Sequence, residues 1–193
     1  SEHFIYLNDD VFLAKPLDKA FFFDESGASR SFLEGCGMVS GAVTEGDPDY
    51  LNAARNVAGL LRDGMGFVPT QLHQHTAFAL RRSVLAEIEA RWQDRFDALR
   101  GNRFRTSGDI NVTSFLYHHY AMATGQARIG TVNNAFVKSM DVRWRDKLKD
   151  AAKPIYDTVC INEGGSDEPA SDWHPAVKDF LKKAFSQKAP WEK

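Results

Sequence analysis

Polar residues that can bind a cation follow the first apolar stretch of the chain. Residues 4–7 are apolar and predict a short buried strand, and Asn8, Asp9 and Asp10 come directly after it. Two adjacent carboxylates at the end of a buried strand are costly to desolvate without a partner, and a divalent cation can supply one. A polar turn explains the same residues equally well, because Asn and Asp are common turn formers.

A second polar pair, Asn162 and Glu163, follows the apolar residues 154–161, which predict another strand. If the two strands are parallel neighbours, both polar groups meet at one edge of the sheet, where α/β proteins build their ligand sites. A solvated turn is the alternative. For Asn162 and Glu163 taken alone, the turn is the favoured interpretation.

Histidines are candidates for a general base, because the pKa of this side chain lies near neutral pH. His73 and His75 lie just ahead of a long helix that the apolar spacing predicts over residues 78–99. Most loop histidines cap or pack, and we expect this of His75.

Arg105 precedes a helix that the apolar pattern predicts over residues 109–124. A guanidinium makes bidentate bonds to phosphate, and the free N–H groups of a helix start add to such a site. An Arg105–Asp109 ion pair that caps the helix is the alternative, and both can hold. Arg103 is expected on the surface. His119 falls on the apolar stripe of the helix and is expected to be a satisfied core residue.

Strands alternate with helices along the chain, which favours an α/β fold with a mainly parallel sheet flanked by helices. The expected architecture is Rossmann-like or nucleotide-sugar-transferase-like, in a single catalytic domain over residues 1–193. The stretch 26–46 predicts a loop or a weak hairpin. Further helices are predicted over residues 47–64 and 175–185, and a polar helix or turn over residues 142–152. Further strands are predicted over residues 127–130 and 134–140.

Composition limits the classes of function. Of the 193 residues, 43% are hydrophobic and 26% are charged, which is typical of a globular domain with its own core. A net charge of −2 argues against a broad nucleic-acid-binding surface. No apolar run reaches the roughly 20 residues that a membrane-spanning helix needs. The two cysteines form no metal-ligand spacing, and a reduced cytosolic setting fits them.

Several motifs resemble those of one known family, in the order that the family has them. FIYLNDDVF, residues 4–12, resembles the second conserved region of the Stealth proteins. LHQ at residues 72–74, with ALRRSVL after it, resembles the third region, and RFRTSGDIN, residues 103–111, resembles the family's RFRS-x-x-D signature. VCIN, residues 159–162, resembles the fourth region. The resemblance covers nearly the whole chain.

Stealth proteins are sugar-phosphate transferases that build bacterial capsular and cell-wall polysaccharides. Their animal relative is the lysosomal-enzyme N-acetylglucosamine phosphotransferase. The resemblance implies transfer of a sugar phosphate from a nucleotide-sugar donor of the UDP-hexosamine type to a hydroxyl of a glycan acceptor. This reaction forms a phosphodiester and releases UMP, in the synthesis of capsular or other cell-surface polysaccharide.

The resemblance also implies which residues act. Asp9, Asp10 and Glu163 would hold Mg²⁺ or Mn²⁺, although the family usually has Asp where this chain has Glu163. Asp9 and Asp10 would also be catalytic residues. His73 would take the proton of the acceptor hydroxyl, and Arg105 would stabilise the oxygens of the transferring phosphoryl group. Residues implied in substrate binding are Asn8, Asp109 and Asn162. The family often has Pro where this chain has His75, so His75 is expected to tolerate replacement by Pro.

Two other functions stay open. A metal-dependent glycosyltransferase of similar fold would attack the anomeric carbon and release UDP, and a glycan-binding or assembly subunit would have no activity. The chain begins with Ser1 and enters a strand almost at once, so we expect it to be a fragment that an upstream part with the family's first region precedes. The expected location is the cytoplasm, or the periphery of the inner face of the membrane.

Overall fold

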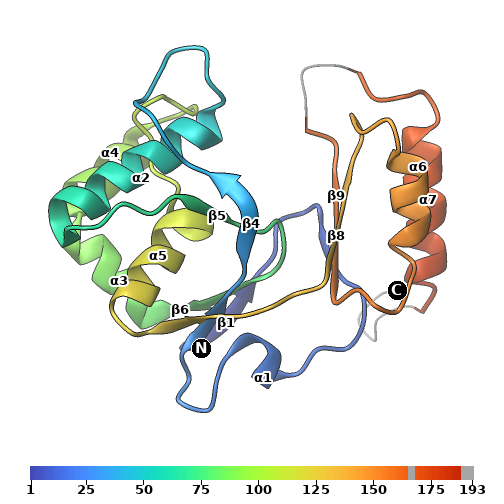
Figure 1. Cartoon of the computed structure of the whole chain (residues 1–193), viewed down its shortest axis with the longest axis horizontal. Helices are drawn as coiled ribbons and strands as arrows, with labels where there is room; N and C mark the ends of the chain where they lie inside the picture. Colours follow the sequence, from blue (N-terminus) through green and yellow to red (C-terminus); the bar gives the residue numbers. More distant parts are fainter. Residues whose placement is uncertain (165–167, 188–193) are drawn as a thin grey trace. The chain divides into compact units, whose positions relative to one another are not determined.

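The computed structural model describes residues 1–164 and 168–187, without the side chains of residues 36–38. The chain divides into two compact units, each drawn from several segments (Figure 1). Unit 1 consists of Ser1–Tyr6, Asp18–Gln74 and Phe78–Gly130. Unit 2 consists of Leu7–Leu17, His75–Ala77 and Thr131–Lys193. The single catalytic domain expected from the sequence stays a prediction.

Unit 1 contains two-stranded sheets whose partners are far apart in the sequence. Two pairs are antiparallel: β1 (His3–Tyr6) with β6 (Phe78–Arg81), and β4 (Leu33–Met38) with β5 (Gln71–His73). One pair is parallel: β3 (Ser29–Ser31) with β7 (Ala127–Ile129). The loop or hairpin expected over residues 26–46 therefore contains β3 and β4, and each of these strands pairs with a remote segment instead of with the other.

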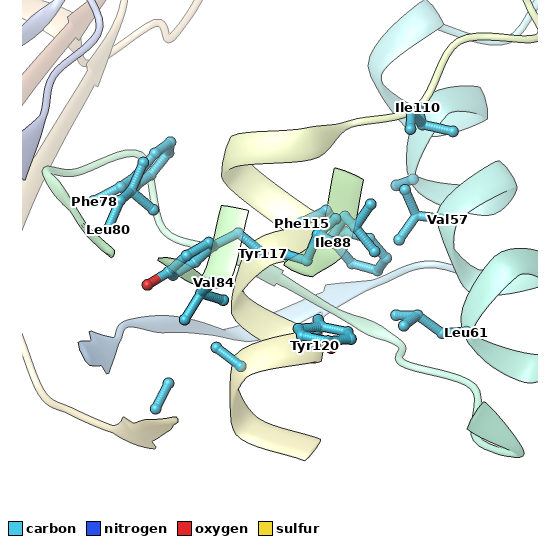
Figure 2. Close-up of a cluster of buried hydrophobic side chains, with 14 of the residues drawn as sticks. Val57, Leu61, Phe78, Leu80, Val84, Ile88, Ile110, Phe115, Tyr117 and Tyr120 are labelled. Atoms are coloured by element: carbon cyan, nitrogen blue, oxygen red, sulfur yellow. The ribbon is translucent and has the colours of Figure 1, made fainter. Parts of the chain in front are cut away.

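The core of unit 1 lies among its helices (Figure 2). The helices are α1 (Lys19–Phe22), α2 (Asp49–Met65), α3 (Arg82–Arg91), α4 (Gln93–Gly101), the π-helical turn η1 (Val112–Leu116) and α5 (Tyr117–Ala123). Val57 of α2, Ile88 of α3 and Phe115 of η1 are fully buried in this cluster. Apolar burial at helical spacing is what holds such short helices in place, because isolated helices of this length are marginal in water.

The prediction of one helix over residues 78–99 is wrong at its start, where a strand forms. The remaining residues form two helices instead of one. Phe78, Ala79 and Leu80 are all buried, and they pair with β1 as strand β6. A run of apolar residues fits a buried strand as well as a helix, so the distant partner decides. Trp92 then leaves helical geometry, with φ −127° and ψ 41°, and separates α3 from α4.

Two other helix ends differ from the expectation. Helix α2 runs past Gly64 to Met65, and Gly66 ends it with a left-handed φ of 76° that favours glycine. The helix expected from Asp109 begins later, with η1. Asn111 caps η1, because its side-chain oxygen accepts a hydrogen bond from the Ser114 N–H.

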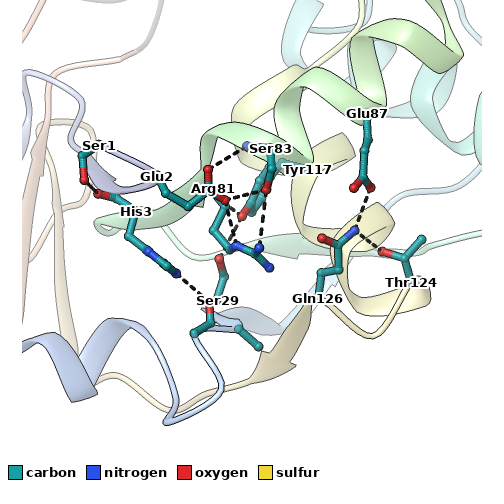
Figure 3. Close-up of polar contacts among 12 residues, drawn as sticks. Ser1, Glu2, His3, Ser29, Arg81, Ser83, Glu87, Tyr117, Thr124 and Gln126 are labelled. Carbon is teal, nitrogen blue, oxygen red and sulfur yellow. Dashed lines mark hydrogen bonds and ion pairs between the residues drawn. The ribbon is translucent and has the colours of Figure 1, made fainter.

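Tyr117 connects several elements of unit 1 through a buried polar network (Figure 3). Its hydroxyl accepts a hydrogen bond from the Arg81 N–H at 2.8 Å and lies 2.8 Å from the Ser29 hydroxyl. Glu2 extends the network, because its carboxylate accepts hydrogen bonds from the Arg81 guanidinium and the Ser83 N–H. The Tyr117 hydroxyl and the Glu2 carboxylate thus both have partners, which stabilises the junction of β3, β6 and α5.

Unit 2 is a three-stranded sheet covered by two helices. Strand β9 (Thr158–Asn162) lies between β2 (Val11–Leu13), which is antiparallel to it, and β8 (Asn134–Lys138), which is parallel to it. Helices α6 (Trp144–Asp150) and α7 (Trp173–Ala184) lie together beside this sheet (Figure 1). The rings of Trp144 and Trp173 meet edge to face at 5.0 Å and join the two helices.

The α/β class expected from the sequence is confirmed. Parallel pairing, however, is limited to β3–β7 and β8–β9, whereas β1–β6, β4–β5 and β2–β9 are antiparallel. The sheets are therefore small and mixed, where a mainly parallel sheet was expected. Among the described residues, no helix has both the length and the apolar character that crossing a lipid bilayer requires.

Candidate functional site

Asp10 and Asn162 meet in unit 2, at one end of the β2–β9 pair. Val11 is aligned with Cys160 in the antiparallel register, so the residue before β2 lies beside the last residues of β9. The Ile161 N–H donates to the Asp10 carbonyl oxygen at 2.8 Å, and the Asn162 side-chain amide donates to Asp10 Oδ2 at 2.9 Å. Of the two polar groups expected to converge, Asp10 and Asn162 do so. The strand that brings them together is β2, which follows Asp10 and runs antiparallel to β9, and not the expected strand over residues 4–7, which pairs with β6.

The other two residues of the first polar group lie at the surface. Asn8 and Asp9 are exposed, and the Asn8 carbonyl oxygen accepts the Val11 N–H at 3.1 Å to close a turn. Asp10 differs, because its Oδ1 is buried without a hydrogen-bond partner among the described residues. A buried carboxylate oxygen without a partner carries a large desolvation cost, which a bound cation removes.

His75 joins this group, although the sequence indicated only a packing role for it. Three possible ligand atoms lie within 4.8 Å of one another, one each from Asp10, His75 and Cys160. His75 itself is exposed. Burial and the nearby charge of Asp10 raise the pKa of the Cys160 thiol, which donates a hydrogen bond to Asp10 Oδ2 at 3.3 Å. The site thus combines a carboxylate, an imidazole and a protonated thiol.

Contacts within unit 2 hold His75 in place. Its ring stacks on Phe136 of β8, with centroids 4.7 Å apart and planes inclined by 15°. Its carbonyl oxygen accepts the Asn134 side-chain amide at 3.0 Å. The next residue, Thr76, is buried and lies 2.7 Å, hydroxyl to hydroxyl, from Thr158 at the start of β9. The short segment His75–Ala77 is therefore fixed to the sheet on which Asp10 and Cys160 lie.

Glu163 contacts a different residue from those gathered at Asp10. Its carboxylate contacts the His174 Nε2 at 2.8 Å, and both side chains are more than half exposed. It is not among the ligand atoms that gather at Asp10. A role for Glu163 in metal binding stays a prediction.

His73 is a buried residue of unit 1. Its Nε2 accepts the Phe32 N–H at 3.0 Å, and its Nδ1 donates to the Gln74 carbonyl oxygen at 2.8 Å. Its ring also stacks on His118 at 3.8 Å between centroids. Both ring nitrogens are thus used by the backbone, and the side chain is 4% exposed. His119, which donates to the Gln71 carbonyl oxygen at 2.8 Å, is the satisfied core residue that was expected.

Arg105 and Asp109 lie in a tight turn of unit 1 that precedes η1. The Asp109 carboxylate accepts hydrogen bonds from the Thr106 N–H and hydroxyl and from the Asn102 amide. Burial raises the pKa of Asp109, but these hydrogen bonds and the charge of Arg105 outweigh it and hold the pKa below its usual value. Asp109 therefore shapes the turn, and Asn111 caps η1 instead of Asp109, which the alternative interpretation had suggested. Arg105 and Arg103 are exposed.

Part of the chain matches a protein-family model. The model that describes conserved region 3 of the Stealth proteins matches residues 74–123. Within these residues, the chain carries the third conserved region of the Stealth family. The matched region begins one residue after His73 and contains His75, Arg105 and Asp109. A catalytic role for His73, which the resemblance implied, stays a prediction. The matches to the second and fourth regions stay predictions.

The chain is also similar over its whole length to several polysaccharide phosphotransferases. It is 38% identical over 207 residues to the capsular polysaccharide phosphotransferase SacB of Neisseria meningitidis serogroup A. Over 201 residues it is 38% identical to an exopolysaccharide phosphotransferase of Nocardia farcinica and to the exopolysaccharide phosphotransferase CpsY of Mycobacterium tuberculosis. The chain spans 37%, 39% and 37% of the length of these three relatives.

Proposed function

We propose that the protein to which this chain belongs transfers a sugar phosphate from a nucleotide-sugar to a glycan hydroxyl, in the synthesis of a capsular or exopolysaccharide. The observation that carries the proposal is the gathering of Asp10, Asn162 and His75 at one end of the β2–β9 pair, in a chain whose relatives are named phosphotransferases. A carboxylate, an amide and an exposed imidazole are the groups that such a transfer uses.

In the proposed reaction, the acceptor hydroxyl oxygen attacks the β-phosphorus of a UDP-sugar. The bond between that phosphorus and the oxygen bridging the two phosphates breaks, so UMP leaves and the sugar phosphate becomes a phosphodiester. The acceptor loses its proton to His75. We assign this role to His75 instead of His73, because His75 is exposed, whereas both nitrogens of His73 are already bonded within the fold. This proposal replaces the expectation that His75 only packs and tolerates Pro.

The cation expected for this reaction is Mg²⁺ or Mn²⁺. The residues fit it at Asp10, whose buried Oδ1 has no hydrogen-bond partner among the described residues and is a hard oxygen ligand. Asp10, with the exposed Asp9 beside it, would hold the ion. Bound there, the ion supplies neutralisation of the charge on the donor's phosphates. Asn162 orients the Asp10 carboxylate through their hydrogen bond.

Arg105 is proposed as the residue that stabilises the phosphoryl oxygens. Its guanidinium is exposed in the Asp109 turn and lies within the matched region 3. Asn8 and Asp109 are proposed to act in substrate binding, Asp109 by fixing the turn that presents Arg105. The cytoplasmic location expected from the sequence stays a prediction.

The identity of the released nucleotide tests the proposal. The full-length protein should release UMP from the donor, and phosphorus NMR of the polymer should show a phosphodiester signal. Release of UDP together with a phosphate-free glycoside would establish the metal-dependent glycosyltransferase instead. Glycan binding without turnover of any UDP-hexosamine would favour the non-catalytic subunit.

A further inference from the structure

We propose that Asp10, His75 and Cys160 form a binding site for a thiophilic divalent ion such as Zn²⁺. The site differs in chemistry from an Mg²⁺ or Mn²⁺ site, because it offers one sulfur, one imidazole nitrogen and one carboxylate oxygen. Soft thiolate and imidazole ligands select zinc, whereas magnesium prefers oxygen ligands only.

The spacing of the three ligand atoms supports this site. They lie within 4.8 Å of one another. Around a tetrahedral zinc ion, with bonds of about 2.0–2.3 Å, neighbouring ligand atoms are roughly 3.5 Å apart. Cys160 and Asp10 already have such a separation, with the sulfur 3.3 Å from Oδ2. The His75 ligand atom lies within 4.8 Å of both other ligand atoms.

A buried carboxylate oxygen of Asp10 is a second, independent observation that supports a metal ion at this site. Its Oδ1 is buried and has no hydrogen-bond partner among the described residues. The Cys160 thiol donates its proton to Asp10 Oδ2, and a metal ion bound by the sulfur and this oxygen would replace that hydrogen bond. Zinc displaces that proton, since a coordinating thiol loses its proton outright to the ion. The released proton goes to solvent, and the ion gains a thiolate and a carboxylate.

Neighbouring residues hold the three ligand residues in place before a metal ion binds. Cys160 and Phe136 are paired in the β8–β9 register, and the Phe136 ring carries the stacked imidazole of His75. The Asn162 amide holds Asp10 from the other side. Three protein ligands leave the fourth zinc position open to water, as in catalytic zinc sites.

Zinc in this position would inhibit the proposed transferase, because it withdraws the base and the carboxylate together. This consequence rests on the proposed function, whereas binding of the ion does not. The two are therefore tested separately.

Binding is tested with Co²⁺, which replaces Zn²⁺ and reports a thiolate ligand by a charge-transfer absorption band. The protein is the full chain with Cys36→Ser, so that Cys160 is the only remaining cysteine. Titration with Co²⁺ should produce the band, one equivalent of Zn²⁺ should remove it, and a large excess of Mg²⁺ should not. His75→Ala should weaken Co²⁺ binding at least tenfold, and Cys160→Ser should abolish the band.

His174→Ala is the matched control, because it removes an exposed histidine of unit 2 that is not part of the cluster. It should leave the titration unchanged. His75 is exposed, so its replacement tests the site even if Cys160→Ser unfolds the chain, which circular dichroism reveals. Absence of the band in Cys36→Ser, or an unchanged titration in His75→Ala, would overturn the zinc site.

Inhibition is then measured with the full-length enzyme. The Zn²⁺ concentration that halves the activity should rise at least tenfold in Cys160→Ser, relative to the activity of that variant without zinc. Zinc binding without inhibition would keep the site and contradict the role proposed for His75. Inhibition that is equally strong in Cys160→Ser would show that zinc acts at another site.

Discussion

The side-chain amide of Asn162 donates a hydrogen bond to Asp10 Oδ2 across 2.9 Å, at the end of the β2–β9 pair. Asn162 is the last residue of β9, and Asp10 immediately precedes β2. Because the two strands are antiparallel, the beginning of one lies at the end of the other. The contact places a carboxylate with a buried, unpaired oxygen beside an amide that holds its orientation.

Asp10→Asn should abolish the activity of the full-length enzyme. The substitution removes the negative charge and turns one oxygen into a donor that faces the Asn162 amide. Loss of a charge that binds the cation costs several kcal/mol of transition-state stabilisation, which is roughly 100-fold or more in rate. Turnover and Mn²⁺-dependent binding of the nucleotide-sugar are the measurements. Asp146→Asn, an exposed aspartate of the same unit, is the control and should behave as wild type. Wild-type turnover in Asp10→Asn, or full activity with excess chelator, would refute the role of Asp10.

His75 and His73 should respond differently to replacement by alanine. His75→Ala should lower the turnover rate roughly 10²- to 10⁴-fold and keep the thermal unfolding of wild type, because an exposed base is lost. His73→Ala should lower the free energy of unfolding by about 1–3 kcal/mol, because the buried Phe32 N–H loses its acceptor. Activity assays and denaturant unfolding of both variants separate the two roles. An active His75→Ala beside an inactive but fully stable His73→Ala would return the base to His73.

The sequence predicted which polar residues gather better than it predicted how the strands are arranged. The convergence of Asp10 with Asn162 was expected from parallel strands over residues 4–7 and 154–161, yet β2, which follows Asp10, produces it in an antiparallel register with β9. Apolar periodicity shows that residues 4–7 and 154–161 prefer extended structure, but the partner and direction of a strand depend on contacts remote in the sequence. The same limit applies to Phe78–Arg81, which pairs with β1 as a strand although its pattern suits a helix.

The choice between two nearby histidines also lay beyond the sequence. His73 ends β5 and points into unit 1, while His75, two residues later, belongs to unit 2. Nothing in the motif LHQ shows that the chain passes from one unit to the other at this point. The approach of His73 and Arg105 to Asp9 and Asp10, which the sequence suggested, stays a prediction.

Arg105→Ala should reduce the catalytic efficiency of the full-length enzyme roughly 10²- to 10³-fold, if its guanidinium stabilises the charge on the transferring phosphoryl group. Arg105→Lys should restore only part of this loss, because an ammonium cannot form the bidentate contact. Arg103→Ala is the matched control, since Arg103 is exposed two residues away and lies over the Phe104 ring. Equal losses in Arg103→Ala and Arg105→Ala would point to a general effect of positive charge.

His118 should make the stability of the fold fall as the solution becomes acidic. Burial first, and then the charges of His73 and His119, hold the pKa of His118 well below its ordinary value. Above the ordinary histidine pKa of about 6.5, the side chain is neutral in the folded and the unfolded state, and its packing is fully stabilising. Below that pH, the unfolded chain binds a proton that the folded chain excludes. The free energy of unfolding then decreases by about 1.4 kcal/mol per pH unit, until the folded pKa is reached.

Urea unfolding of the chain at about pH 7.5 and at about pH 5.5 measures this dependence. His118→Gln cannot titrate, and its amide can still bond to Ser31, whose hydroxyl lies 2.9 Å from His118 Nδ1. The variant should therefore lose less stability on acidification than the wild type. Part of the dependence should remain, because burial also lowers the pKa of His119. His174→Gln removes an exposed histidine and should follow the wild type. An acid-induced loss in His118→Gln as large as that of the wild type would mean that other groups cause it.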